Sequence, residues 1–332
     1  MAALDDALEN DDLVRMFLYG SPGTRKTWWA GRAAEAGFNV ILADIDHGHK
    51  ILKQLSPEAR KRIFHIDMRA PDDGYGNSGS AALAYAMNGT VTFFDEETRK
   101  FVGRTKLDPA RKYVQLDFSR LTNRDILIVD SWTSKVQQLG LLNQVIVDPT
   151  KLSKFEWDDY AKMRLVLDHF LSGVKKCNGH VIVIGHTDTY AKRKKDASEK
   201  AKPEDAIEQI RTQPYSVTRA HAETMAANFS DVLHFEINSS MVGTMITTKG
   251  DADFDAKSRS MAPITASFEK LRFEQFVSQT NLDLVKDNPT YSSQAAKEVM
   301  GSDVIAAIEA NKGSADIKVG GITTLKIGGN KA

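Results

Sequence analysis

The feature that most constrains this chain is a short loop between an apolar run and a helical pattern. Its residues read Gly-Ser-Pro-Gly-Thr-Arg-Lys-Thr at positions 20–27. The apolar residues 13–19 predict a strand, and the helical pattern after the loop ends near Gly37. Such a loop binds phosphate because its backbone N–H groups point inward at a helix N-terminus, where the positive end of the helix dipole lies. Lys26 would reach the β and γ phosphates, and the Thr27 hydroxyl would coordinate Mg²⁺.

The loop departs from the pattern G-x-x-x-x-G-K-[ST] because Arg25 stands where the second glycine is expected. A side chain at this position could crowd the phosphates, since glycine is used where backbone must approach a ligand closely. Gly23 supplies part of the missing flexibility. An ordinary Pro-Gly turn between a strand and a helix is the alternative, but we favour nucleotide binding. The candidate ATP-binding residues are Gly20, Ser21, Pro22, Gly23, Thr24, Arg25, Lys26 and Thr27.

The composition excludes several other classes of protein. The 332 residues include 44 Lys and Arg and 44 Asp and Glu, so no net charge draws the whole protein to nucleic acid or acidic lipid. The single cysteine, Cys177, excludes an internal disulfide and a cysteine-rich zinc site, and we expect it to be a small buried residue. No leader pattern and no apolar run approaching about 18 residues is present, so we expect a soluble, intracellular protein with no membrane partner.

Two further apolar runs end in carboxylates. Residues 38–46 predict a strand buried on both faces, and the alternation of side chains would place Asp44 and Asp46 on one face at its end. Residues 125–131 predict a later core strand with Asp130 at its end, which fits a Walker B strand that holds Mg²⁺ through water. Ligands bind at the carboxyl ends of parallel strands, so we expect these acids beside the loop. The predicted metal ligands are Thr27 and Asp130.

A histidine and a basic run follow the next predicted strand. Residues 181–188 predict another buried strand, and His186 near its end would lie beside the phosphates. A lone histidine is usually structural, but at this edge of the sheet we interpret it as a γ-phosphate sensor. Residues 189–218 predict a long polar loop that contains four consecutive basic residues, 192–195. A charge run is usually a solvated face, whereas a long loop in a compact domain is more often functional or disordered.

The rest of the chain divides into an arm, a core and an extension. Residues 1–12 are acidic and polar and predict an N-terminal arm. The core spans 13–272, and within it residues 70–120 lose the α/β rhythm and predict an insertion with a β-hairpin at 89–103. Residues 273–332 predict a helical extension followed by a tail rich in glycine and lysine.

The order of these motifs resembles the core of RecA-like ATPases over about residues 13–262. It is most similar to the phage-encoded branch that acts in recombination and single-strand annealing. The resemblance rests on the phosphate loop and four segments in the same order, 42–47, 126–131, 183–186 and 255–259. It implies an α/β fold with a mainly parallel central sheet, ATP and Mg²⁺ as cofactors, and a phage protein that acts in the cytoplasm of its host.

The resemblance also implies roles for matching positions. Asp46 takes the place of the acid that activates the attacking water, which is usually Glu, and His186 takes the place of a sensor that is commonly Gln. Lys257 and Arg259 match a basic pair that reaches the ATP of an adjacent subunit; a surface Lys and Arg on an edge strand is the alternative. The implied catalytic residues are Asp46, Lys26, His186, Lys257 and Arg259.

The segment after the sensor strand is where such proteins hold single-stranded DNA. This maps onto residues 187–218 and makes phosphate contacts of Lys192, Arg193, Lys194 and Lys195. Our main hypothesis is an ATP-dependent protein that binds single-stranded DNA, assembles into a filament or ring with ATP at subunit interfaces, and promotes annealing or strand exchange. Two alternatives stay open: a nucleotide-binding regulatory or structural module with little turnover, suggested by Arg25 and Asp46, and a ring-forming DNA motor or helicase.

Overall fold

The computed structural model describes residues 12–68, 83–84, 86–88, 91–94, 113–116, 118, 121–137, 139, 157–193, 207–238, 243–251, 255–260 and 264–288. The chain forms two compact units. The first contains residues 1–66, 122–137 and 179–290, and the second contains residues 67–121, 138–178 and 291–332. The candidate site lies wholly in the first unit.

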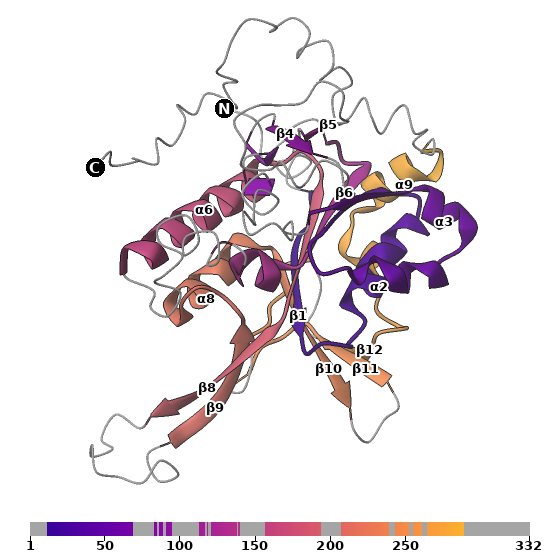
Figure 1. The fold of residues 1–332 in the computed structure, drawn as a ribbon. Coiled ribbons are helices and arrows are strands. Elements are labelled where there is room, and N and C mark those ends of the chain that lie inside the picture. Colours follow the sequence, from indigo (N-terminus) through magenta and orange to yellow (C-terminus); the bar gives the residue numbers. More distant parts are fainter. Residues whose placement is uncertain are drawn as a thin grey trace, which may run out of the picture. The chain divides into compact units, whose positions relative to one another are not determined.

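A mainly parallel sheet forms the centre of the first unit (Figure 1). Among the described residues its order is β12-β11-β10-β1-β7-β6-β2-β3. The strands are β1 (Arg15–Gly20), β2 (Asn39–Asp44), β3 (Ile63–Asp67), β6 (Asp125–Asp130), β7 (His180–Gly185), β10 (Asp231–Asn238), β11 (Gly243–Thr247) and β12 (Thr265–Ser267).

The five strands β10, β1, β7, β6 and β2 run parallel to one another, and β11 and β12 add an antiparallel edge next to β10. Strands β2, β6 and β7 are buried at every position, as expected for continuous apolar runs covered on both faces. The expected fold class, α/β with a mainly parallel central sheet, is confirmed, and the strand arrangement is consistent with a RecA-like core.

Helices and short 3₁₀ turns cover both faces of this sheet (Figure 1). On one side lie α2, α3 and α9, and on the other lies α8. The first-unit elements are α2 (Lys26–Gly31), η1 (Arg32–Ala34), η2 (Gly48–Gln54), α3 (Pro57–Lys61), α8 (Arg219–Met225), η5 (Ala226–Asn228), η6 (Phe273–Phe276) and α9 (Gln279–Lys286). Side-chain hydroxyls cap three of the helices, because Ser56, Thr218 and Ser278 each accept a hydrogen bond from a backbone N–H three residues on.

The core of this unit is organised around Trp29. Its ring meets Phe235 and Phe276 edge-on at centroid distances of 5.8 and 6.1 Å, and its Nε1 donates to the Leu271 carbonyl at 2.7 Å. Phe273 is fully buried in the same cluster. The core therefore continues beyond residue 272, where we expected the extension to begin, because apolar side chains after that point complete the packing under α2.

The described part of the second unit contains α6 (Trp157–Lys176) and a two-stranded sheet. In that sheet β4 (Val91–Phe94) pairs antiparallel with β5 (Tyr113–Leu116). The hairpin that we expected within 89–103 therefore has its described return strand further along the chain. Cys177 is buried, as expected, with its Sγ 3.8 Å from the Phe118 carbonyl oxygen.

The prediction of a long loop at 189–218 is wrong. The structure has an antiparallel hairpin there, formed by β8 (Thr187–Arg193) and β9 (Ile207–Pro214), which extends away from the central sheet (Figure 1). Threonine and tyrosine on β8, and isoleucine and threonine on β9, favour extended backbone, although charged residues outnumber them in the segment 187–214 as a whole. Within the described residues, no helix combines the length and apolar character needed to cross a bilayer.

Candidate functional site

The carboxyl ends of four parallel strands meet at one edge of the sheet. In the register of the ladder, Asp44 of β2 lies opposite Asp130 of β6, and Asp130 lies opposite Ile184 of β7. Tyr19, at the end of β1, lies opposite Gly185. Because side chains that follow these positions emerge at the same edge, the structure brings the phosphate-loop candidates together with those from the two later strands.

The backbone of the loop takes conformations that favour glycine. Gly20 is pressed against β10, and a Cβ there would lie 2.1 Å from the Phe235 carbonyl oxygen. Gly23 has a φ of 82°, and Arg25 has a φ of 59° and a ψ of 27° in the left-handed region. The Arg25 side chain is exposed, with its guanidinium carbon 5.6 Å from the centroid of the Phe268 ring. Arg25 therefore departs from the motif in its side chain while its backbone adopts the geometry that a glycine would take easily.

Lys26 lies buried inside the loop. Its Nζ donates hydrogen bonds to the Gly20 carbonyl at 2.8 Å, the Ser21 carbonyl at 2.9 Å and the Thr24 hydroxyl at 3.0 Å. Burial lowers the pKa of Lys26 to about 8, although the negative charges of Asp130 and Asp46 oppose the shift. The ammonium is thus held at the floor of the loop, where phosphate oxygens could replace the loop oxygens as its partners.

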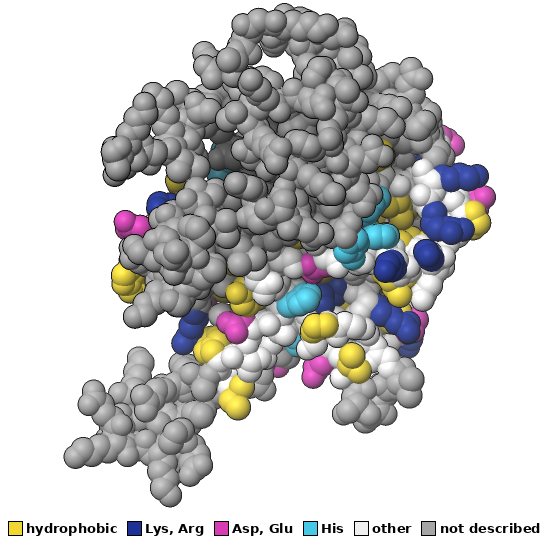
Figure 2. Space-filling model, in the orientation of Figure 1, with side chains coloured by type: hydrophobic (Ala, Val, Ile, Leu, Met, Phe, Trp, Pro, Cys, Tyr) yellow, Lys and Arg dark blue, Asp and Glu magenta, His cyan; other side chains and the backbone are white. Residues whose placement is uncertain are grey.

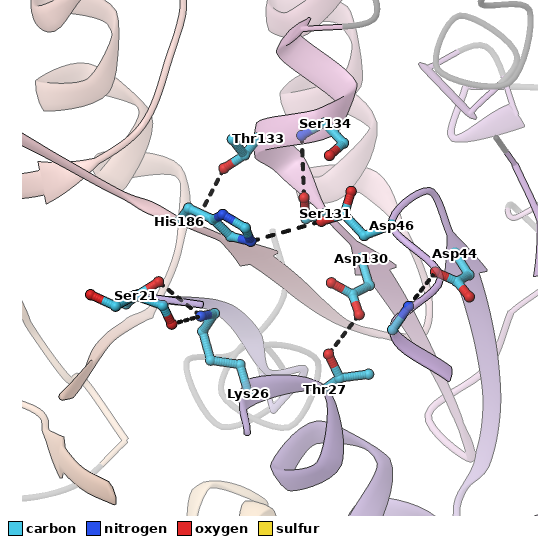
Figure 3. A network of polar contacts seen from close by, with 12 residues as sticks. Ser21, Lys26, Thr27, Asp44, Asp46, Asp130, Ser131, Thr133, Ser134 and His186 are labelled. Carbon is cyan, nitrogen blue, oxygen red and sulfur yellow. Dashed lines mark hydrogen bonds and ion pairs between the residues drawn. The ribbon is translucent and has the colours of Figure 1, made fainter. Parts of the chain in front are cut away.

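Thr27 and Asp130 form a hydroxyl–carboxylate pair. Thr27 Oγ1 donates to Asp130 Oδ2 at 2.6 Å (Figure 3). Gly48 closes over the pair, because a Cβ there would lie 2.2 Å from Asp130 Oδ2 and 3.1 Å from Thr27 Oγ1. Burial raises the pKa of Asp130 to about 7, the nearby Asp46 and Asp44 raise it further, and the Thr27 hydrogen bond and Lys26 oppose the rise. A hydroxyl oxygen and a carboxylate form an oxygen-only donor set, which fits Mg²⁺.

Asp46 and His186 face each other across the cavity (Figure 3). Their side chains approach to 3.8 Å between Nε2 and Oδ2, and the His186 backbone N–H donates to the Thr133 hydroxyl at 2.8 Å. Burial lowers the pKa of His186 and the Lys26 charge lowers it further, while Asp46 opposes both. The imidazole is therefore neutral at pH 7.

The expectation that Asp44 and Asp46 share one face of a strand is wrong. Strand β2 ends at Asp44, and the backbone N–H groups of Ile45 and Asp46 both turn to the Asp130 carbonyl. The alternation of side chains does not extend to Asp46. Asp46 consequently lines the phosphate cavity, whereas the buried Asp44 contacts His49 and His65.

A cavity of about 620 Å³ joins these groups. This volume lies within the range of roughly 300–1,000 Å³ found for small-molecule sites. The lining residues are Pro22, Gly23, Arg25, Lys26, Thr27, Asp46, Gly48, Ile51, Asp130, Ser134, Ile184 and His186.

Lys257 and Arg259 lie elsewhere. Lys257 forms an isolated antiparallel bridge with Val232 rather than lying in a regular strand, and it lines a second cavity of about 480 Å³. Burial lowers the pKa of Lys257, and the charge of Arg259 adds to the effect. The chain between them is anchored, since Ser258 and its neighbour Ser260 donate to the two carboxylate oxygens of Asp231. Neither basic residue is part of the lining of the phosphate cavity.

The basic run divides between described and undescribed residues. Lys192 and Arg193 belong to β8, and Lys194 and Lys195 lie outside the described residues. Nearer the base of the hairpin, the guanidinium carbon of Arg219 lies 3.8 Å from the centroid of the Tyr190 ring. Sequence reasoning missed His49 and His65, because their meeting at Asp44 depends on β2 and β3 being neighbours in the sheet.

No protein-family profile and no curated protein matches the sequence. Among solved structures, the flagellar accessory protein FlaH from Methanocaldococcus jannaschii is similar over 80% of this chain and 92% of its own, with 12% identity and a TM-score of 0.34. A likeness of that extent carries no information about function. The assignment of the fold therefore rests on the strand order and on the loop described above.

Proposed function

We propose that this protein binds ATP with Mg²⁺ in the cavity at the sheet edge and hydrolyses it. One observation carries the proposal: Lys26, the Thr27–Asp130 pair and the Asp46–His186 pair converge on a single cavity from four separate strand ends. These are the charges and donors that a triphosphate and its metal require. When bound, Mg²⁺ would neutralise phosphate charge between Thr27 and Asp130.

Three residues of the chain have separate roles in the proposed hydrolysis. Lys26 exchanges its loop oxygens for phosphate oxygens and stabilises charge on the transferred group. Asp46 has a partly exposed carboxylate and orients an attacking water. His186, neutral at pH 7, reports the γ-phosphate through a hydrogen bond and holds Asp46 in place.

The test is turnover measured with and without Mg²⁺ on the full chain. Wild-type protein should release phosphate from ATP only with Mg²⁺, and Asp46→Asn should lower turnover by about 10²-fold while nucleotide binding stays. The matched control is Asp188→Asn, an acid in β8 outside the cavity lining, which should keep wild-type turnover. Equal turnover in Asp46→Asn and wild type would remove Asp46 from the mechanism.

We propose further that the β8–β9 hairpin binds single-stranded DNA through its basic residues. Support comes from the hairpin's extension away from the sheet and from the four consecutive cations of residues 192–195, of which Lys192 and Arg193 belong to β8. Such contacts are electrostatic, so affinity should fall steeply with salt. Replacing residues 192–195 with alanine should abolish the anisotropy change of a labelled oligonucleotide. Replacing Lys175 and Lys176, exposed cations at the end of α6, should not.

Self-association and annealing are further parts of this proposal. Lys257 and Arg259 lie outside the phosphate cavity, which is where residues would be expected if they act on a neighbouring subunit's nucleotide. Mixing Asp46→Asn protein with Lys257→Ala/Arg259→Ala protein tests this. Each variant alone should be inactive, and the mixture should recover part of the turnover, because some interfaces then contain both intact partners. A mixture as inactive as its components contradicts action between subunits.

A second function has a specific observation in its favour. Arg25 holds a side chain at the rim of the cavity in a backbone conformation that disfavours one. A nucleotide-binding regulatory module with slow turnover is the alternative. A strong rise in turnover in Arg25→Gly would favour it.

A further inference from the structure

A cluster of histidine side chains lies beside the phosphate cavity but outside its lining. His49 Nδ1 lies 2.6 Å from Asp44 Oδ2, and His65 Nε2 lies 3.0 Å from the same oxygen. One ligand atom from each of the three residues lies within 4.8 Å of the other two. Asp44 ends β2, His49 opens the turn after it, and His65 lies on the neighbouring β3. Figure 2 shows histidine side chains gathered at the surface of the visible face.

The burial of the cluster is graded from inside to outside. The Asp44 side chain is 1% exposed, while His49 and His65 are 33% and 35% exposed. The Gly48 backbone N–H fixes the second carboxylate oxygen, Oδ1, at 3.1 Å. The cluster thus presents a buried carboxyl group whose Oδ2 meets two imidazoles that open to solvent.

A fourth histidine adds an independent observation. The ring of His47 lies 5.6 Å from that of His49 between centroids. Its Nδ1 is buried and has no hydrogen-bond partner among the described residues. His47 also has a left-handed φ of 62°, between Asp46 and His49. Its buried nitrogen calls for a polar partner that the described residues do not supply.

We propose that Asp44, His49 and His65 bind a zinc-like divalent transition-metal ion, with a remaining position open to water. Two imidazole nitrogens and one carboxylate oxygen form a donor set that suits zinc. Ligand atoms about 2.1 Å from a tetrahedral ion lie about 3.4 Å from one another, so small side-chain rotations convert the hydrogen-bonded cluster into a ligand set.

The site differs in kind from the one proposed for Mg²⁺. Magnesium prefers oxygen donors and retains waters, as the Thr27–Asp130 pair allows, whereas imidazole selects softer ions. The position of the proposed zinc site also connects it to the phosphate cavity. Residues 45–49 join the two sites, and Asp46 and Gly48 of this segment line the phosphate cavity. A metal ion bound by Asp44, His49 and His65 would hold the two ends of segment 45–49 close to β2 and β3. The ion would thereby restrict the position of Asp46.

The experiment uses the full chain without a histidine tag, dialysed and then titrated with Zn²⁺ and, separately, Co²⁺. We expect a single ion per chain and the intense visible absorption of tetrahedral Co²⁺. His49→Asn and His65→Asn should each remove that absorption and weaken Zn²⁺ binding by more than the roughly 10- to 100-fold found for outer-shell partners. His169→Asn, at an exposed position on α6, is the matched control and should leave both unchanged.

Two outcomes overturn the proposal: no stoichiometric uptake by the wild type, or uptake that both histidine variants retain. Circular dichroism of each variant checks folding. If an asparagine variant unfolds, His65→Glu decides, since a carboxylate of similar reach is also a zinc ligand and should retain Zn²⁺ binding. A His65→Glu protein that folds and takes up no metal equally overturns the proposal. Nucleotide binding by the same samples is measured separately, so failure of the metal site and failure of the proposed function are distinguishable.

Discussion

Asp44 and Asp130 lie side by side at the ends of neighbouring parallel strands, and both are buried. Their environments nevertheless shift the two pKa values in opposite directions. Hydrogen bonds from His65 and His49 outweigh burial and lower the pKa of Asp44. Asp130 has one hydroxyl partner and two acidic neighbours, and burial raises its pKa to about 7. Burial alone does not decide the state of a carboxylate. The partners do, and of these two carboxyl groups only Asp130 has a raised pKa.

The largest change in the free energy of unfolding should come from Asp130→Asn. The folded state of the wild type keeps a proton on Asp130 up to about pH 7, whereas the unfolded state releases it near the ordinary value of 3.8. The unfolded state therefore binds fewer protons between these values, and this group's contribution to stability falls as pH rises through them. Removing the charge should raise the free energy of unfolding at pH 8 by up to about 4 kcal/mol, at roughly 1.4 kcal/mol per pKa unit.

Urea unfolding at pH 5 and pH 8 measures this. The gain in Asp130→Asn should be larger at pH 8 than at pH 5, and Mg²⁺-dependent turnover should disappear. A variant less stable than wild type at pH 8 would show that Asp130 is not held against its ionisation.

Asp44→Asn should act in the opposite direction. Its lowered pKa means that Asp44 stabilises the folded state above the unfolded-state pKa, and that this contribution is lost as pH falls through the folded-state value. Loss of two charge-assisted hydrogen bonds should lower the free energy of unfolding at pH 7 by about 2–3 kcal/mol. The comparison with Asp130→Asn uses the same substitution one strand away. Stabilisation by both variants would contradict the difference between the two sites.

His186 should show an intermediate effect that depends on pH. Its lowered pKa favours the neutral imidazole at pH 7, so protonation of His186 should lower wild-type turnover only on the acid side of pH 7. His186→Gln keeps a neutral hydrogen-bonding side chain and should remove that acid limb while retaining most turnover at pH 7. His186→Ala should lose about tenfold or more at every pH. An unchanged acid limb in His186→Gln would assign it to another group.

The smallest effect on stability should come from Arg25→Gly. Relief of the left-handed conformation should stabilise the fold by about 1 kcal/mol, and the greater freedom of glycine in the unfolded chain should offset most of it. Arg25→Ala is the control, because it keeps a Cβ in the left-handed backbone and removes the rest of the side chain, including the guanidinium. Turnover that rises in both variants would identify the side chain as the brake; a rise in glycine alone would identify the backbone.

The sequence predicted the parts of the site that depend on local pattern. Continuous apolar runs identified β1, β2, β6 and β7, and the rule that ligands bind at carboxyl ends placed Lys26, Thr27, Asp130 and His186 on one edge. Asp130 ends β6, His186 follows β7 directly, and only the phosphate loop separates β1 from Lys26 and Thr27. Strand order and this short loop therefore bring these residues together.

Three features needed information that a single pattern does not contain. The end of β2 at Asp44 is fixed by backbone hydrogen bonds to Asp130, a contact between distant segments. The meeting of His49 and His65 depends on strand order. The sequence did not predict the β8–β9 hairpin, because charged residues outnumber β-branched residues in this segment. Cross-strand pairing nevertheless stabilises it.

Calorimetric titration of the full chain with ATP in the presence of Mg²⁺ tests the central claim most directly. The account predicts saturable binding of a single nucleotide per chain, loss of that binding in Lys26→Ala, and little change in Lys257→Ala/Arg259→Ala at protein concentrations too low for assembly. Binding that persists unchanged in Lys26→Ala, or no binding by the wild type, would contradict it.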